Sequence, residues 1–216
     1  MQKSIKSNDT LLLTYFNQHC FNVYCDNKEY AEVLSSHFKY YVDGVGIRLA
    51  YNYLKRTSIE KFNASDLNDS IFKLLEETKL PVTVIGGSFS RELVNSKHLN
   101  VSLYLNGFED VEDLEKASSL ISGSESRIII IGMGVPKQEL FAYNLSIKID
   151  GLVIICVGNY LEFYFGTLKR APKILHNSGF EWIYRIYTEP RRLWKRYLIG
   201  IPLFIYRIIK IKIKNA

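Results

Sequence analysis

Three groups of residues in this sequence are suited to chemistry, and the first is a single carboxylate. Asp43 lies in the sequence VDGVG, directly after a short apolar run. An aspartate of ordinary acidity is ionised at neutral pH and can accept a proton from a hydroxyl group. The simpler interpretation of an Asp-Gly pair is a turn in which the aspartate bonds its own backbone, and the residues alone favour it.

The second group consists of two glycine-containing segments that each follow an apolar run. Gly86-Gly87-Ser88 follows PVTVI, and the segment IIIIGMGVPKQE ends in the polar residues Lys137, Gln138 and Glu139. Glycine allows close approach of the backbone to a ligand, and the start of a helix attracts phosphate. Taken singly, such glycines more often form plain turns. Neither segment completes GxGxxG or GxxxxGK[ST], so the sequence does not support a dinucleotide fingerprint or a Walker loop.

The third group is a set of cations near the C-terminus, in YRIYTEPRRLWKRY. Arg185 and Arg192 are seven residues apart, so they share one face if a single helix runs through Pro190. Basic runs of this kind are often only solvated surface. Here tryptophan and tyrosine residues alternate with the cations, which favours an interfacial surface.

Charge is distributed unevenly along the 216 residues, whose formal net charge is +6. Residues 169–216 contain 12 Lys and Arg against two acidic residues, whereas the preceding 168 residues contain 16 against 20. A basic, aromatic-rich segment that follows an acidic body indicates an anionic partner. Nucleic acid, a lipid surface and a diphosphate are all candidates.

Length and composition predict one globular domain, because 216 residues with 47% hydrophobic content can bury a full core. Cys20, Cys25 and Cys156 are too few and too irregularly spaced for a disulfide framework or a zinc site, so we expect reduced thiols. The four histidines show no ligand spacing, and we expect neither a metal nor a cofactor. The N-terminal residues lack a signal-peptide core, which predicts a cytosolic protein.

Apolar runs alternate with segments of helical character. We expect strands at Thr10–Phe16, Lys39–Val42, Pro81–Ile85, Asn100–Leu105, Arg127–Ile131 and Gly151–Val157. We expect helices at Lys28–Phe38, Ile47–Lys55, Asp66–Thr78, Arg91–Ser96, Val111–Ile121 and Gln138–Ile147. Ser65 or Asp66 is available as the N-cap of the third helix.

Continuous apolar strands separated by helices predict a Rossmann-like α/β fold, with a mostly parallel sheet covered by helices on both faces. Such sheets bind ligands beyond the carboxyl ends of their strands. The loops expected at that edge are Asp43–Gly46, Gly86–Ser88, Gly132–Gln138 and Gly158–Glu162.

The C-terminal tail combines an apolar stretch with regularly spaced cations. Tyr197–Tyr206 is apolar, and the residues after it alternate isoleucine with Arg207, Lys210, Lys212 and Lys214. Ten residues of helix cover about 15 Å, half of a hydrocarbon core of about 30 Å, and cannot cross a membrane. An ordinary core helix or strand is the alternative, but the frequent lysines favour a segment that lies in the membrane surface with its cations among the headgroups. We therefore expect a catalytic domain over residues 1–178 and a basic, apolar, helical appendage that associates with membrane over residues 179–216.

The phrases VDGVG, IIIIGMGVPKQE, GTLKRAP and GFEWIYRIYTEPRRLWKRY make this sequence resemble the WecG/TagA/CpsF family of bacterial glycosyltransferases (glycosyltransferase family 26). The resemblance covers about residues 12–204 and is most specific after Ile128. It implies an enzyme that moves a hexose from a UDP-sugar to an undecaprenyl-diphosphate-linked sugar in the synthesis of a bacterial surface polysaccharide. The hexose would be of the N-acetylmannosamine, uronic or glucose type. The resemblance also implies a peripheral protein at the inner face of the cell membrane.

The same resemblance assigns roles to individual residues. Asp43 is the general base, and one base in a single displacement inverts the anomeric centre. Donor binding is assigned to Asn17, Gly86, Gly87, Gly132, Gly134, Pro136, Lys137, Gln138 and Glu139. Gln138 offers hydrogen bonds to sugar hydroxyls or to an N-acetyl group. Charge neutralisation at the diphosphate, without a metal ion, is assigned to Arg185, Arg192, Lys195 and Arg196.

Three positions depart from the family pattern. Tyr15 stands where the family has a threonine, and the adjacent Thr14 would point to the other side of a regular strand. Lys61 occupies an arginine position, and Asn159 occupies a glycine position. Because these changes fall in the donor region, the sequence leaves the donor sugar open.

Two functions from other classes are less well supported. A non-catalytic module that binds nucleic acid or membrane through its basic tail is disfavoured by the acidic body and by the absence of a nucleic-acid motif. A Rossmann-type oxidoreductase is disfavoured by the incomplete glycine fingerprint. We therefore expect three partners: a UDP-sugar, a polyprenyl-diphosphate-linked acceptor and an anionic membrane surface. We expect no nucleic acid.

Overall fold

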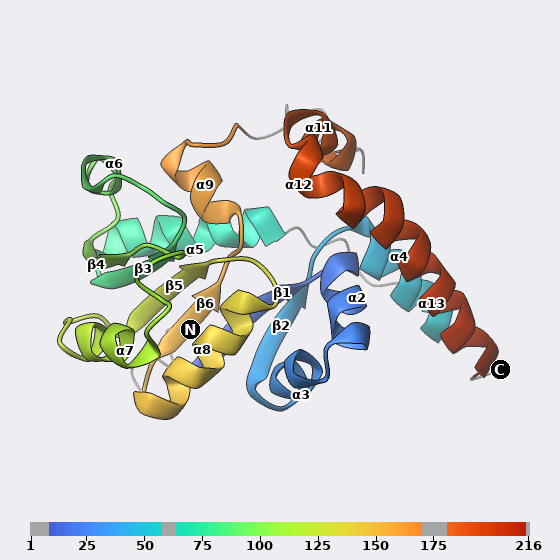
Figure 1. Cartoon of the computed structure of the whole chain (residues 1–216), viewed down its shortest axis with the longest axis horizontal. Helices are drawn as coiled ribbons and strands as arrows, with labels where there is room; N and C mark the ends of the chain where they lie inside the picture. Colours follow the sequence, from blue (N-terminus) through green and yellow to red (C-terminus); the bar gives the residue numbers. More distant parts are fainter. Residues whose placement is uncertain (1–8, 58–63, 170–180, 215–216) are drawn as a thin grey trace. The chain divides into compact units, whose positions relative to one another are not determined.

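The computed structural model of the chain describes residues 9–57, 64–169 and 181–214 (Figure 1). Packing divides the chain into two compact units. The first unit comprises Met1–Tyr15, Glu29–Tyr40 and Ser65–Leu168, and the second comprises Phe16–Lys28, Tyr41–Ala64 and Lys169–Ala216. The second unit therefore combines the C-terminal segment with two segments from the first third of the sequence. The expected boundary between residues 178 and 179 lies outside the described residues and stays a prediction.

Six strands of the described chain form one sheet in the order β2-β1-β6-β5-β3-β4. The strands are β1 (Leu11–Phe16), β2 (Phe38–Val42), β3 (Val82–Gly86), β4 (Val101–Leu105), β5 (Ile128–Gly132) and β6 (Val153–Cys156). The pairs β1–β6, β6–β5, β5–β3 and β3–β4 are all parallel. The Rossmann-like α/β fold is confirmed, and each expected strand is present.

The helices flank this sheet in the first unit and pack on one another in the second. The first set is α3 (Lys28–His37), α5 (Ala64–Thr78), α6 (Arg91–Asn95), α7 (Leu114–Ser122), α8 (Lys137–Lys148) and α9 (Tyr160–Phe165). The second set is α2 (Gln18–Asp26), α4 (Val45–Lys55), α11 (Glu181–Thr188), α12 (Pro190–Trp194) and α13 (Gly200–Lys214), with a π-helical turn η1 (Lys195–Ile199) before α13.

Both faces of the central strands are covered, which explains their continuous apolar sequences. In β5, Ile128 and Ile130 belong to a core cluster that includes Phe72 of α5 and Phe165 of α9. Ile129 and Ile131, which alternate with them, are also fully buried and point to the opposite face of the sheet. Figure 1 shows α8 across one face of the sheet and α5 behind the other.

Two helices start at positions that differ from the expected ones. α5 begins at Ala64, so Ser65 and Asp66 lie in its first turn and the expected cap at either residue is wrong. α7 begins at Leu114, later than expected, because the Asp113 Oδ1 atom accepts a hydrogen bond of 3.0 Å from the Lys116 amide. An aspartate at this position, the N-cap, sets the start of the helix because its side chain accepts a hydrogen bond from an otherwise free amide.

Glycine is required where β3 and β5 end side by side. Gly86 lies opposite Gly132 in the parallel pair, and its φ is +137°. A Cβ atom on Gly86 would lie 2.5 Å from the Gly132 carbonyl oxygen. The two backbones therefore approach more closely than any side chain allows.

We predict that Gly86→Ala lowers the free energy of unfolding by about 2 kcal/mol or more, because it adds a backbone clash to a strained φ. Gly134→Ala is the matched control, since Gly134 has a φ of +80° but nothing within 4 Å of the added Cβ. The control should lose only the conformational strain, about 1 kcal/mol. Chemical denaturation measures both, and equal losses would contradict the clash.

Candidate functional site

The strand order identifies one position at the sheet edge where a ligand is expected. β3 continues through α6 to β4 on one side, whereas its neighbour β5 continues through α8 to β6 on the other side. In open parallel sheets, ligands bind beyond the carboxyl ends of strands at such a change of direction. Gly86–Ser88 and Gly132–Lys137 follow β3 and β5 at this point, so the structure brings the two predicted glycine segments together.

The backbone around this position is held by close contacts and one lysine. A Cβ atom on Gly107, in the loop after β4, would lie 2.6 Å from the Gly86 Cα atom. Lys137, the first residue of α8, donates a hydrogen bond of 2.9 Å from Nζ to the Gly107 carbonyl oxygen. Because Lys137 is otherwise exposed, its ammonium can still offer donors to a phosphate.

The Gln138 side chain is fully buried and forms hydrogen bonds with the backbone of two surrounding loops. Its Oε1 atom accepts hydrogen bonds from the Gly134 amide at 3.3 Å and the Gly158 amide at 3.1 Å. Its Nε2 atom donates to the Glu139 Oε1 atom at 2.7 Å. With 0% of its surface exposed, this side chain joins the loops after β5 and β6. Its expected contact with a sugar stays a prediction.

Glu139 is a buried carboxyl group at the centre of the same network. Its Oε1 atom accepts a second hydrogen bond, of 2.7 Å, from the Thr14 hydroxyl, while its Oε2 atom has no hydrogen-bond partner among the described residues. Burial raises the pKa of Glu139 to about 7, against the opposing effect of the Gln138 and Thr14 hydrogen bonds. Glu139 is 0% exposed, and its expected contact with the donor stays a prediction.

The two residues at the end of β1 point to opposite sides, as the strand geometry predicts. Thr14 is buried against Glu139. The Tyr15 ring lies against Gly158, where a Cβ atom would be 2.5 Å from the Tyr15 hydroxyl oxygen. The aromatic ring at the family's threonine position therefore packs on the loop after β6.

In the second unit, Asn17 links a helix terminus to the predicted base. Its Oδ1 atom accepts hydrogen bonds from the His19 and Cys20 amides at 3.0 and 3.2 Å, which caps α2. Its Nδ2 atom donates to the Asp43 Oδ2 atom at 3.4 Å. Asn17 is buried, and in the structure it caps the helix and orients the carboxylate. Its expected contact with the donor stays a prediction.

Asp43 is half-buried at the end of β2. Its amide donates to the Phe16 carbonyl oxygen at 2.8 Å, and Gly44, with a φ of +86°, turns the chain into α4. Asp43 thus lies where the chain bends from β2 into α4, and one of its carboxylate oxygens is oriented by a side chain from another segment.

His19 and Arg196 both belong to the second unit, and the charge of Arg196 acts on His19. Burial, with a smaller effect from the Arg196 charge, lowers the pKa of His19 to about 4. His19 is therefore neutral at physiological pH. The buried Nε atom of Arg196 has no hydrogen-bond partner in the described part of the chain.

The other predicted cations are arranged differently from the expectation. Glu189 has non-helical dihedral angles (φ −132°, ψ 57°), and Pro190 begins a new helix. The single helix on which a shared face of Arg185 and Arg192 depended is therefore interrupted, because the chain leaves the helical conformation between them. Arg192 pairs with Glu189 at 2.6 Å, Lys195 lies 5.5 Å from the centre of the Trp194 ring, and the Arg185 side chain lies outside the described structure.

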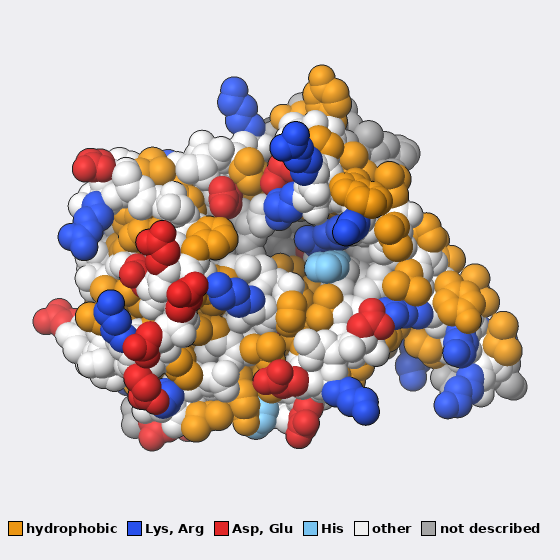
Figure 2. Space-filling model, viewed as in Figure 1, with side chains coloured by type: hydrophobic (Ala, Val, Ile, Leu, Met, Phe, Trp, Pro, Cys, Tyr) orange, Lys and Arg blue, Asp and Glu red, His pale blue; other side chains and the backbone are white. Residues whose placement is uncertain are grey.

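The C-terminal helix presents apolar residues and lysines on its outer side. Figure 2 shows hydrophobic and basic side chains mixed along α13. The exposed apolar residues of η1 and α13 are Leu198, Ile199, Ile205, Tyr206, Ile209 and Ile213. None of the described helices is long and apolar enough to cross a membrane.

Two of the four tail cations expected among headgroups contact the protein instead. Arg207 bonds Asn22 and Asp26, and Lys212 donates to the Leu54 carbonyl oxygen at 3.3 Å. Lys210 and Lys214 remain exposed. Arg207 and Lys212 thus have polar partners on α2 and α4, and contact of the tail cations with headgroups stays a prediction.

Sequence reasoning missed two helices that matter here, α2 and α9. A signal for α2 was present, since Asn17 is a good N-cap and Cys20, Phe21 and Tyr24 follow at helical spacing. By contrast, the hydrogen bond between Thr14 and Glu139 joins residues 125 positions apart. No local pattern could have indicated it.

Comparison with known proteins gives a consistent result. The whole chain, residues 1–216, matches the glycosyl transferase WecG/TagA/CpsF family. A protein of Staphylococcus aureus strain MRSA252, named N-acetylglucosaminyldiphosphoundecaprenol N-acetyl-beta-D-mannosaminyltransferase, is 28% identical over 215 residues, which cover 97% of this chain and 84% of that protein. Proteins of the same name from strains NCTC 8325 and COL are 27% identical, with the same coverage.

The buried carboxyl group of Glu139 predicts a specific pH dependence of stability. Below the ordinary pKa of 4.5 the group is protonated in both the folded and the unfolded state, whereas between 4.5 and about 7 only the folded state retains the proton. Stability therefore falls as the pH rises through this window. Glu139→Gln removes the ionisation, so its stability relative to the unmodified chain should rise by up to about 3 kcal/mol between pH 4.5 and 8.

Denaturant unfolding at several pH values measures this difference. Glu112→Gln makes the same chemical change at an exposed position, so its relative stability should show no comparable rise. A stability difference for Glu139→Gln that stays constant over the whole range would mean that the buried carboxyl group titrates normally.

Proposed function

This chain belongs to the WecG/TagA/CpsF family of glycosyltransferases, and from that premise we propose that it transfers a hexose from a UDP-sugar to an undecaprenyl-diphosphate-linked sugar. The match over the whole chain is the observation that carries the proposal. The name of the Staphylococcus aureus relatives supports an N-acetylmannosamine-type donor and an N-acetylglucosamine-linked acceptor. Uronic and glucose-type donors are the alternatives to be tested.

Asp43 is the proposed general base. Its carboxylate accepts the proton of an acceptor hydroxyl while that oxygen attacks the anomeric carbon, and UDP departs with the electrons of the broken bond. The hydrogen bond from Asn17 to Oδ2 supports this role, because it limits the rotation of the carboxylate. A single displacement inverts the configuration, so an α-linked nucleotide sugar would give the β product that the relatives' name specifies.

The glycine segments beyond β3 and β5 are the proposed donor-binding loops. Gly86, Gly87, Gly132 and Gly134 would let the diphosphate of the donor approach the backbone, close to the start of α8. Pro136 and Lys137 lead into that helix, and the exposed Lys137 ammonium would add a positive charge. In this proposal Gln138 and Glu139 hold the loops in place, as their burial and hydrogen bonds support.

Cations of the C-terminal segment are proposed to neutralise the acceptor diphosphate. The buried Nε atom of Arg196, which has no hydrogen-bond partner among the described residues, supports this role best, because a buried donor without a partner is costly unless a ligand satisfies it. Lys195 and Arg192 are exposed nearby in sequence, and Arg185 is included on the family resemblance alone. Fixed cations of this kind would stabilise a diphosphate without a divalent ion.

We also propose that the protein works at the inner face of the cell membrane. The apolar residues and lysines on the outer side of α13 would insert shallowly among anionic lipids. Trp194, which is 42% exposed, suits the headgroup level.

The proposed activity is tested with a panel of UDP-sugars and a synthetic prenyl-diphosphate N-acetylglucosamine acceptor, with UDP release as the readout. We expect transfer from UDP-N-acetylmannosamine that persists in EDTA. Asp43→Asn keeps the shape of the side chain and should reduce kcat by about 100-fold or more, because it removes the base. Asp66→Asn, an exposed change on α5, is the control.

Two results would contradict this proposal in different ways. An Asp43→Asn protein that is folded and fully active would refute the assignment of the base. Absence of transfer from every UDP-sugar would refute the donor class.

For the membrane, the informative change is Lys210→Glu combined with Lys214→Glu, because deletion of the tail would remove the buried Phe204 and Ile208 as well. Two lysines near an anionic surface contribute about 2 kcal/mol, so co-sedimentation with anionic vesicles should weaken about 30-fold or more. Reversal of Lys73 and Lys116, exposed on α5 and α7, is the control for net charge. Unchanged sedimentation of the tail variant would exclude the proposed face.

A further inference from the structure

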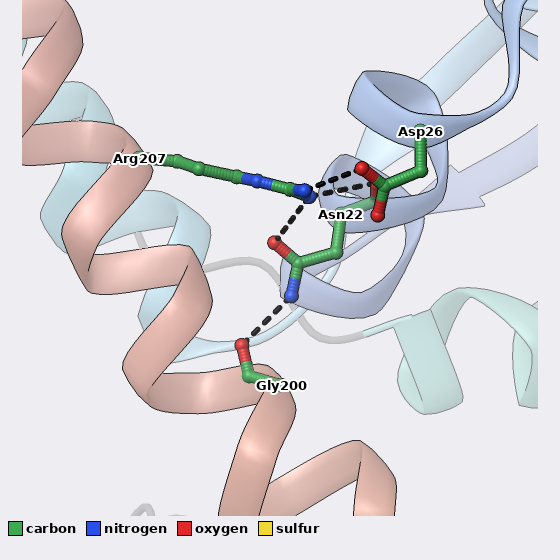
Figure 3. A network of polar contacts seen from close by, with 4 residues as sticks. All are labelled: Asn22, Asp26, Gly200 and Arg207. Atoms are coloured by element: carbon green, nitrogen blue, oxygen red, sulfur yellow. Dashed lines mark hydrogen bonds and ion pairs between the residues drawn. The ribbon is translucent and has the colours of Figure 1, made fainter.

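One face of α2 carries a row of polar side chains that meets the C-terminal helical run. His19, Asn22 and Asp26 are three and four residues apart, so they lie along one side of the helix. Arg196 acts on His19 through its charge, Gly200 and Arg207 contact Asn22, and Arg207 contacts Asp26. Partners follow in the same order on both segments, which defines a parallel polar seam. Figure 3 shows the part of the seam formed by Asn22, Asp26, Gly200 and Arg207.

Asn22 is the centre of this seam. Its Nδ2 atom donates a hydrogen bond of 2.7 Å to the Gly200 carbonyl oxygen. Arg207 donates from Nη1 to the Asn22 carbonyl oxygen at 2.9 Å and to its Oδ1 atom at 3.2 Å, while Nη2 of the same arginine forms an ion pair with Asp26. Asn22 is 7% exposed, and the Arg207 side chain is 18% exposed. The nitrogen and the oxygen of this buried amide both have hydrogen-bond partners.

The contact at Gly200 coincides with an irregular turn of the helix. Pro202 has no amide hydrogen to donate to the Leu198 carbonyl oxygen, as a regular α-helix would require. The chain forms the π-helical turn η1 just before this point, and the Gly200 amide donates to the Lys195 and Tyr197 carbonyl oxygens. A π-turn changes the direction of the side chains within it, and Arg196 lies in this turn.

Apolar packing alone would not define where α13 sits along its neighbours. Phe204 and Ile208 pack with Phe21 of α2 and with Ile47 and Ala50 of α4. The sequence of α13 (GIPLFIYRIIKIKIK) is rich in isoleucine, so a shift by one helical turn would again place apolar side chains against the same surface. On the α2 side, the contacts of Arg207 and of the Gly200 carbonyl distinguish one register from the other, and the Lys212 hydrogen bond to the Leu54 carbonyl of α4 is a further contact of this register. A buried polar contact is a known means of fixing helix register.

We propose that the contacts of Asn22 and Asp26 with Arg207 and Gly200 fix the register of the C-terminal helix on α2, and so hold Arg196 beside His19 at the same end of α2 that carries Asn17 and Asp43. Arg207 and Asn22 are then positioning residues for the diphosphate of the acceptor. This inference rests on the proposed transfer to a diphosphate-linked acceptor. If Arg207 has this positioning role, it is not one of the cations proposed to face lipid.

The informative variant combines Asn22→Leu with Arg207→Met, which replaces the polar contacts with apolar groups of similar size. Such replacements often preserve stability, so a loss of function would report position rather than unfolding. With a short-chain, water-soluble acceptor, the acceptor KM should rise about tenfold or more, while the donor KM and the melting temperature stay close to those of the unmodified protein. Arg207→Lys, which keeps the charge but loses the forked geometry, should give an intermediate acceptor KM.

Lys73→Met, a loss of one exposed charge on α5, is the control and should leave both KM values unchanged. An unchanged acceptor KM in the double variant would overturn the inference. Equal increases of the donor and acceptor KM would also overturn it, because they would indicate general loosening.

The register can also be measured without any activity, which separates this inference from the proposed function. Cys25 on α2 is exposed while Cys20 and Cys156 are buried, and Ile213 on α13 is 73% exposed. Spin labels on Cys25 and on Ile213→Cys should give one narrow distance in the unmodified background. The double variant should give a second distance or a broad distribution, shifted by about 5 Å for one turn. An unshifted, narrow distribution would show that these contacts do not fix the register, whatever the enzyme assay shows.

Discussion

A buried side-chain amide must satisfy both its oxygen and its nitrogen, and three such amides hold the segments that carry the predicted chemistry. Gln138 joins the loops after β5 and β6 and contacts Glu139. Asn17 joins α2 to Asp43, and Asn22 joins α2 to α13. Leaving one of these groups unpaired would cost about 1–3 kcal/mol, so each amide penalises alternative positions of the loops or helices that it joins.

These amides complement an apolar core that is strong but not selective. The sheet buries isoleucine and valine on both faces, and α13 packs on α4 and α2 through further isoleucine and phenylalanine. Apolar contact is non-directional and tolerates shifts that keep the same area buried. Directional bonds with fixed partners are therefore needed wherever one register or one loop conformation is required.

Charge count alone does not identify which C-terminal cations are available to a ligand or a lipid. Arg207 and Lys212 are bound to polar groups of α2 and α4, and Arg192 pairs with Glu189. Lys210 and Lys214 remain exposed. Some cations of this basic segment thus form contacts within the second unit, and others remain exposed and can act on a partner. The neighbouring helices determine which cation belongs to which group.

The sequence by itself determined the fold class, the strands and most helices, because continuous apolar runs and helical periodicity are local patterns. It also placed the glycine segments at the carboxyl ends of strands and indicated the family. The buried positions of Gln138 and Glu139, the capping role of Asn17 and the diversion of Arg207 from solvent were decided only by the tertiary structure. Each depends on partners far away in the chain, such as Thr14 for Glu139 and Asn22 for Arg207. The sequence does not distinguish a polar residue that faces a ligand from one that faces another segment, because its hydrogen-bonding groups are the same in both cases. Only the folded chain supplies the partner.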